Sequence, residues 1–211
     1  MLDNVKSKYI TNQIFENIKN KRKLNLIKYN KRILARLDID KREFEIYEKL
    51  KIFNAKYKTN IEDIDIKELE LNNQFMGNEG LSDLVEIKFK QLDKLELRSN
   101  KISNITILSK VYFKKMKELD LSYNLISDIK VLENVDFKEL IKLDLSYNTI
   151  LDIDILKNVY FKGLKILFLR YTGISFINIL EKYNFKGLQL LDLSHNSISD
   201  IRILEKVDFK L

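Results

Sequence analysis

Apolar residues recur along most of this chain at a fixed step of 24 positions. Two leucines that stand two positions apart open each copy, and the first of each pair is Leu95, Leu119, Leu143, Leu167 or Leu191. Residues two apart point to the same side of an extended strand, so each pair predicts a short strand with one buried side. We therefore expect a series of strands that stack in parallel, about 4.8 Å apart.

Other columns keep the same step. A polar column comprises Asn100, Asn124, Asn148, Thr172 and Asn196, and its amides are expected to bond backbone groups that a turn leaves unpaired. A phenylalanine column comprises Phe89, Phe113, Phe137, Phe161, Phe185 and Phe209, and a lysine follows each ring. We expect the rings inside the coil and the lysines outside. Ile129, Leu132 and Val135 step by three, which favours a short 3₁₀ or single-turn helical return.

A period in the twenties with the pattern L-x-x-L-x-L-x-x-N-x-I resembles the leucine-rich repeat family. The Ser-Asp-Ile motifs at residues 127–129 and 199–201 are similar to those of the SDS22-like and internalin-like subclass of this family. An irregular first copy begins near Leu69, and its step to Leu95 is two positions longer than the others. The resemblance implies that residues 59–211 form an α/β solenoid of about six repeats. Its parts would be a parallel concave sheet and short helical or 3₁₀ convex turns.

Residues 1–58 differ from the repeats in both pattern and charge. Helical spacing of apolar residues predicts three helices, from Val5 to Ile18, from Asn20 to about Leu37, and from Asp40 onward. Residues 1–60 hold 16 lysines and arginines against 7 acidic residues, whereas residues 61–211 hold 22 against 24. We expect residues 1–58 to form a basic three-helix cap over the open end of the repeat core.

The role of this cap has three interpretations. Its second helix carries a row of basic residues suited to the phosphates of RNA or of the ribosome: Lys21, Arg22, Lys23, Lys28, Lys31 and Arg32. The same row is what the solvated face of a cap looks like in a lysine-rich chain. Residues 10–37 also resemble an F-box, through Ile14-Phe15, Leu24–Ile27 and Asn30–Arg32. That resemblance implies a substrate receptor of a ubiquitin ligase.

Residues with catalytic chemistry are few. The chain has no cysteine, which excludes disulfides and thiolate metal sites, and it has no phosphate-binding glycine loop. The one histidine, His195, stands in a repeat column without a catalytic partner. We expect a non-catalytic protein with no cofactor, no metal and no small-molecule substrate. Residues 1–13 lack a secretory core and no apolar run approaches about 20 residues, so we expect a cytoplasmic or nuclear location and no membrane partner.

Residues beside the paired leucines project from the other face of the predicted sheet, and in the family this concave surface binds the partner. Carboxylates and rings gather there and suit a basic, partly apolar protein or peptide. The predicted partner-binding residues are Asp120, Tyr123, Asp144, Tyr147, Ile166, Phe168, Arg170, Tyr171, Asp192 and His195. Repeat five, which opens at Leu167, departs from its neighbours with Phe168, Arg170 and Thr172-Gly173. We hypothesise that the partner contact is centred on Phe168.

Overall fold

The computed structural model of the chain describes residues 41–110, 114–159, 163–181 and 187–206. The chain divides into two compact units, residues 1–64 and residues 65–211, and each is treated separately below. The predicted boundary after residue 58 stays a prediction. The first two predicted helices, the F-box-like segment and the basic row at 21–32 all lie outside the described residues.

In the first unit the described residues form helix α4, Lys41–Tyr57, at the position where a third helix is predicted. Its predicted apolar face is confirmed by Tyr47, Leu50 and Phe53, which are buried. In the last turn of the helix, the Asn54 side chain donates to the Ile61 carbonyl at 2.8 Å and accepts from the Ile61 amide at 3.0 Å. These bonds fix the chain as it leaves the helix, because they satisfy backbone groups beyond its last turn.

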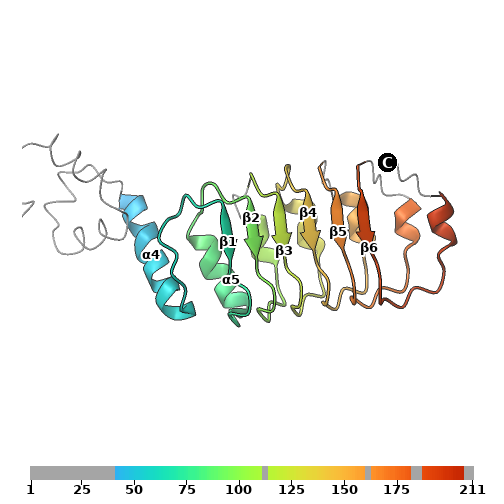
Figure 1. Cartoon of the computed structure of the whole chain (residues 1–211), viewed down its shortest axis with the longest axis horizontal. Helices are drawn as coiled ribbons and strands as arrows, with labels where there is room; N and C mark the ends of the chain where they lie inside the picture. The colour runs from blue at the N-terminus through green and yellow to red at the C-terminus, as the bar shows by residue number, and fades with distance from the viewer. Residues whose placement is uncertain (1–40, 111–113, 160–162, 182–186, 207–211) are drawn as a thin grey trace, which may run out of the picture. The chain divides into compact units, whose positions relative to one another are not determined.

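The described residues of the second unit form one sheet of six parallel strands in chain order (Figure 1). The strands are β1 Glu68–Glu70, β2 Lys94–Glu96, β3 Glu118–Asp120, β4 Lys142–Asp144, β5 Ile166–Phe168 and β6 Leu190–Asp192. From β2 to β6 each residue pairs with the residue 24 positions further on, so Leu95 lies beside Leu119 and Leu143 beside Leu167. The predicted parallel strands and their register are confirmed.

In the described residues, four short 3₁₀ helices return the chain from one strand to the next: η2 Thr106–Lys110, η3 Lys130–Asn134, η4 Asp154–Asn158 and η5 Asn178–Glu181. A similar 3₁₀ helix, η6 Arg202–Lys206, follows β6. The first return is different, because it is the α-helix α5, Gly77–Glu86, which buries Leu81 and Leu84. This helix was not predicted. It occupies the copy whose step is two positions longer than the others, where the longer return leaves room for α-helical turns.

The core lies between the sheet and these returns. Leu95, Leu97, Leu143 and Leu145 have no exposed surface, which confirms the inward direction of the paired leucines. The described rings of the phenylalanine column, Phe89 and Phe137, are 2% and 3% exposed, and burial of each contributes about 1.5–3 kcal/mol. The lysines that follow the column are exposed wherever they are described, at Lys90, Lys114 and Lys138. Phe113, Phe161, Phe185 and Phe209 lie outside the described residues.

The asparagine column joins successive repeats. Asn124 donates to the Leu97 carbonyl of the preceding repeat at 3.0 Å and accepts from the Ile102 amide of that repeat at 2.9 Å. The predicted bonds to turn backbone are confirmed, and the structure adds that they cross between repeats. Thr172 replaces asparagine in repeat five, and its hydroxyl lies 3.0 Å from the carbonyl oxygen of Leu169 in its own repeat.

Candidate functional site

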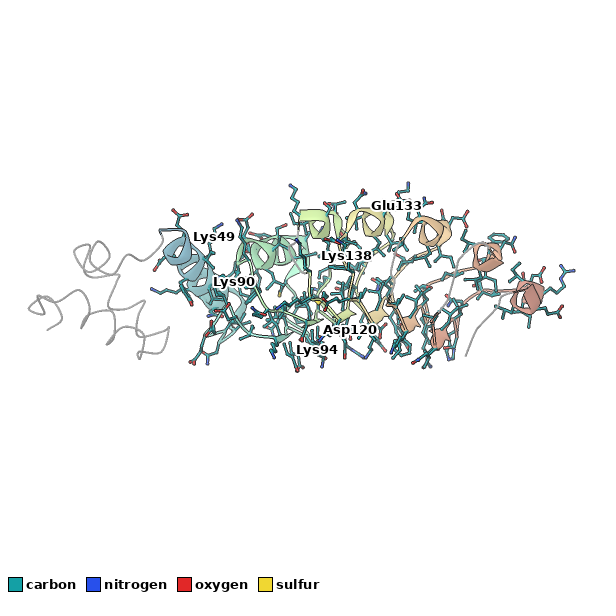
Figure 2. The ribbon with its side chains drawn as sticks, turned by 90° about the horizontal axis from the view of Figure 1, so that it is seen from above. Lys49, Lys90, Lys94, Asp120, Glu133 and Lys138 are labelled. Atoms are coloured by element: carbon teal, nitrogen blue, oxygen red, sulfur yellow. The ribbon has the colours of Figure 1, made fainter. Side chains whose placement is uncertain are left out.

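The first and third residues of each strand point away from the core, because they alternate with a leucine that is buried in β1 to β5 and half-buried in β6. We call the surface that they form with the residues just after each strand the sheet face. Figure 2 shows Lys94 and Asp120 on the strand side of the array and Glu133 on the side of the 3₁₀ helices. All ten predicted partner-binding residues belong to the sheet face, which is the surface predicted to be concave. Whether they bind a partner stays a prediction.

The carboxylates of this face also hold the turns that end the strands. The Asp120 carboxylate accepts from the Ser122 amide at 2.8 Å, and the same bond recurs from Ser146 to Asp144 at 2.9 Å. Phe168 occupies the equivalent place in repeat five and has no oxygen to offer. There the Arg170 amide donates to the Ser146 hydroxyl of repeat four at 3.2 Å. The turn of repeat five is therefore held by a hydrogen bond to repeat four, whereas the turns of Asp120 and Asp144 are held by a carboxylate of their own repeat.

A continuous stack of aromatic rings runs across the strands. Ring centroids lie 3.9 Å apart for Tyr123 and Tyr147, 4.7 Å for Tyr147 and Tyr171, and 4.3 Å for Tyr171 and His195. At the other end the Arg98 guanidinium lies 4.0 Å above the Tyr123 ring. We call these five residues the aromatic stack. Stacking of this kind stabilises neighbouring repeats by about 0.5–1.5 kcal/mol for each pair.

The stack depends on an uncommon backbone conformation. Tyr123, Tyr147 and Tyr171 have φ angles of 55°, 55° and 51°, and His195 has 57°. A left-handed φ is unfavourable by about 1 kcal/mol for a residue other than glycine. The turn therefore imposes a backbone conformation that these residues do not prefer. The sequence prediction missed both features. Within the stack, the faces of these rings contact one another.

Charges on the sheet face are partly neutralised within it. Lys94 and Glu96 form an ion pair of 2.8 Å, and hydrogen bonds from Lys94 and Asn72 lower the pKa of Glu96. A hydrogen bond from Ser194 lowers the pKa of Asp192. Asp144 differs from both, because burial raises the pKa of its carboxyl group.

Repeat five contributes the apolar part of the face. Ile166 and Phe168 are half-buried in β5, and Leu190, which pairs with Ile166, is 43% exposed. The Lys142 ammonium lies 5.8 Å from the centre of the Phe168 ring. Arg170 reaches the other way, and its Nη2 lies 3.0 Å from Nε2 of His195 at the end of the aromatic stack.

A hollow of about 270 Å³ lies between the aromatic stack and Phe168. It brings together six of the predicted residues: Tyr123, Asp144, Tyr147, Phe168, Arg170 and Asp192. Asp120, Ile166, Tyr171 and His195 do not line it. The sequence prediction missed three residues that do, namely Arg98, Ser122 and Ser146. The recurrence of serine two positions after each carboxylate was the available signal for the last two.

The described residues contain no group of three or more side chains suited to hold a metal ion. Within the same residues, no helix has both the length and the apolar character needed to cross a membrane.

Residues 187–206 match the family model described as Leucine Rich Repeat. No curated protein matches the chain. The chain is similar to solved structures of bacterial internalins. An internalin (inlF) from Listeria monocytogenes is 26% identical with a TM-score of 0.45, over 61% of this chain and 42% of that one.

Two further structures from the same comparison show the same kind of likeness. Internalin C2 from Listeria monocytogenes is 21% identical with a TM-score of 0.47, over 72% of this chain and 85% of that one. The functional domain of InlJ from Listeria monocytogenes is 16% identical with a TM-score of 0.36, over 74% and 47%. The chain thus spans less than half the length of the inlF and InlJ structures.

Proposed function

Because the array is built of leucine-rich repeats, we propose that the chain is a non-catalytic protein-interaction scaffold that binds a protein or peptide partner through the sheet face. Solenoids of this kind offer an extended surface whose residues are not needed for the core. The match of residues 187–206 to the repeat family and the constant register of the strands support the scaffold role.

One observation carries the choice of the sheet face. In repeat five the carboxylate column is interrupted by Phe168, and Asp144 and Asp192 are its register partners on either side. The buried leucines of the same repeat, Leu167 and Leu169, are only 2% and 1% exposed. Relaxed packing would have disturbed the core as well. A surface aromatic residue between two carboxylates instead has the composition of an interface anchor.

The charges of the face favour a partner with basic and apolar character. The outward residues of β1–β6 include seven carboxylates, Glu68, Glu70, Glu96, Glu118, Asp120, Asp144 and Asp192, against the two lysines Lys94 and Lys142. Arg98 and Arg170 follow the strands, but both contact rings of the aromatic stack. Complementary charge guides association and suppresses wrong partners, while apolar anchors supply most of the affinity.

A selection experiment tests this proposal without a known partner. A random-peptide library displayed on phage is selected on the full chain, and the Kd of the recovered peptides is then measured against variants. We expect recovered peptides that are rich in basic and apolar residues. Phe168→Asp restores the carboxylate column and should weaken their binding by about 2 kcal/mol, roughly 30-fold, as loss of an anchor does.

Phe176→Asp is the matched control, because it makes the same substitution in the same repeat at a position that is 79% exposed on the turn before η5. It should leave the Kd unchanged. Neither variant should lower the melting temperature below that of the wild type. Recovery of no peptide, or of peptides that lose affinity with Phe176→Asp and not with Phe168→Asp, contradicts binding at the sheet face.

A further inference from the structure

Three polar groups of the hollow beside Phe168 lack full partners in the described part of the chain: the Ser122 hydroxyl, the Asp144 carboxylate and Nε of Arg170. Ser122 lines the hollow and is only 1% exposed, yet its hydroxyl has no hydrogen-bond partner. A buried hydroxyl without a partner is destabilising, because the hydrogen bonds it would make with water are not replaced. This effect is offset when a ligand supplies the missing hydrogen bond.

The second group is the Asp144 carboxylate on β4. It accepts hydrogen bonds from the amide and the side chain of Ser146, but no lysine or arginine nitrogen of the described residues lies within the 4.0 Å of an ion pair. Burial raises the pKa of this carboxyl group, and its effect is larger than the opposing effect of the Ser146 hydrogen bonds. A cation placed in the hollow would favour the charged form of this group.

The two arginines of the hollow do not fill this role. Arg98 lies over the Tyr123 ring at 4.0 Å, and Arg170 is bonded to His195 at 3.0 Å. Both guanidinium groups thus contact rings at the edge of the hollow, and Nε of Arg170 is a buried donor without a partner among the described residues. The walls that remain are the Phe168 and Tyr147 rings, with Asp192 beside Phe168 on the far side from Asp144.

These features fit a side chain that is apolar along its length and cationic at its end. Lysine and arginine carry a methylene stem that packs on apolar surface and a head with several N–H donors. We propose that the hollow seats one basic side chain of the partner, an arginine or a lysine, whose stem lies on Phe168 and whose head is bound by Asp144. This inference rests on the proposed function of the sheet face and specifies its anchor.

Three blocked pentapeptides of the form Gly-Leu-X-Leu-Gly, with X as arginine, norleucine or glutamate, are titrated into the full chain and followed by NMR. Norleucine has an apolar side chain of similar length to the stem and no charge. We expect the arginine peptide to bind at least about tenfold more tightly than the norleucine peptide. Its binding should also lower the pKa of Asp144, read from the side-chain carboxyl carbon.

Asp144→Asn keeps the oxygen that accepts from the Ser146 amide and removes the charge, so it should abolish the preference for arginine over norleucine. Asp120→Asn is the matched control, because Asp120 belongs to the same column and accepts the same bond but does not line the hollow. It should keep the preference.

Three outcomes overturn the inference: equal binding of arginine and norleucine, tighter binding of glutamate through Arg170, or no binding of the arginine peptide at about 10 mM. None of them contradicts the proposed function, because the selection with Phe168→Asp does not depend on which side chain of the partner enters the hollow. Failure of that selection, in contrast, removes the sheet face as the site.

Discussion

Repeat four, residues 143–166, and repeat five, residues 167–190, lie side by side and pair through β4 and β5. Their buried positions agree, because Leu143 and Leu167 are 0% and 2% exposed and Ile150 and Ile174 are both fully buried. Outside the apolar core they differ in several columns, of which four bear on the turns and on the sheet face. Where repeat four has Asp144, Ser146, Asn148 and Asp152, repeat five has Phe168, Arg170, Thr172 and Phe176.

Some of the differences between these repeats fit one another. Leu151 is the one apolar residue in a column that otherwise holds Ser103, Ser127, Ser175 and Ser199. A Cβ atom at Gly173 would lie 2.9 Å from a methyl carbon of Leu151, and Gly173 has φ +86°. Glycine at this position therefore both makes room for the leucine and adopts the left-handed turn without strain. The two repeats differ in a coordinated way.

The comparison separates what the fold requires from what the surface adds. A repeat must supply paired leucines and a ring for the core, and repeat five supplies the leucines unchanged. It gives up polar groups that join or close the other repeats, and it places the Phe168 ring on the sheet face where they have a carboxylate. Phe168 cannot make the hydrogen bond that the carboxylate makes in the other repeats, and its ring is not part of the core. Such a residue suggests a role in binding a partner.

The largest expected effect tests whether the cores of repeats four and five are equally well packed. Leu143→Ala and Leu167→Ala should each lower the free energy of unfolding by about 3 kcal/mol or more, because each removes a fully packed side chain and leaves a cavity. Denaturant unfolding measures both. A clearly smaller cost for Leu167→Ala would mean that repeat five is loosely packed, and its surface changes would then reflect relaxation of the repeat.

The next effect concerns the junction between repeats. Asn148 donates to the Leu121 carbonyl at 3.0 Å and accepts from the Ile126 amide at 2.9 Å, both in the preceding repeat. Asn148→Ala should cost about 2 kcal/mol, because it leaves these buried backbone groups unpaired. Thr172→Ala should cost about half as much, because the hydroxyl lies near Leu169 of its own repeat and near Asn196. Denaturant unfolding of the two variants measures the difference.

Thr172→Asn is the sharper form of the same comparison. Asparagine would restore a donor for the Leu145 carbonyl and an acceptor for the Ile150 amide, as the column does elsewhere. We expect a gain of about 1 kcal/mol in the free energy of unfolding, seen as a higher melting temperature. A loss of stability would show that the junction between repeats four and five has adapted to threonine.

The sequence predicted those parts of the fold that recur in several copies. Leu95, Leu119 and Leu143 occupy the same buried position in successive repeats. Because several copies give the same signal, the prediction for such a position does not depend on the sequence of any single segment. Helix α5 occurs once and was missed, since its pattern of Leu81 and Leu84 lies inside a copy already assigned to a shorter return. The φ angle of 55° at Tyr123 and Tyr147 could not be predicted from the residue type, because the turn imposes that angle.

The sequence predicted which residues share the surface of the candidate site, but it did not predict how their side chains are arranged. The columns placed Asp144, Phe168 and Tyr147 on one surface, which the pairing of β4 with β5 bears out. The stacking of the rings and the unpartnered hydroxyl of Ser122 depend on side-chain directions, which no spacing rule supplies. The direction of Arg170 toward His195 is of the same kind.

The smallest expected effect concerns the turn before each 3₁₀ helix. The side chains of Asn104, Asp128, Asp152 and Asp200 each accept from the amide two residues on, at 2.8, 2.8, 2.8 and 3.0 Å. Phe176 holds the same place before η5 and offers no acceptor to the amide of Asn178. Phe176→Asp should therefore raise the free energy of unfolding by about 1 kcal/mol, as a restored cap does.

Phe176→Ala separates the two properties of this ring, because it removes the aromatic group without adding an acceptor. Since the ring is 79% exposed, this variant should leave the melting temperature within about 1–2 °C of the wild type. A marked loss of stability in Phe176→Ala would show that the ring packs in the free protein. In that event Phe176 would support the fold of repeat five, although its ring is exposed.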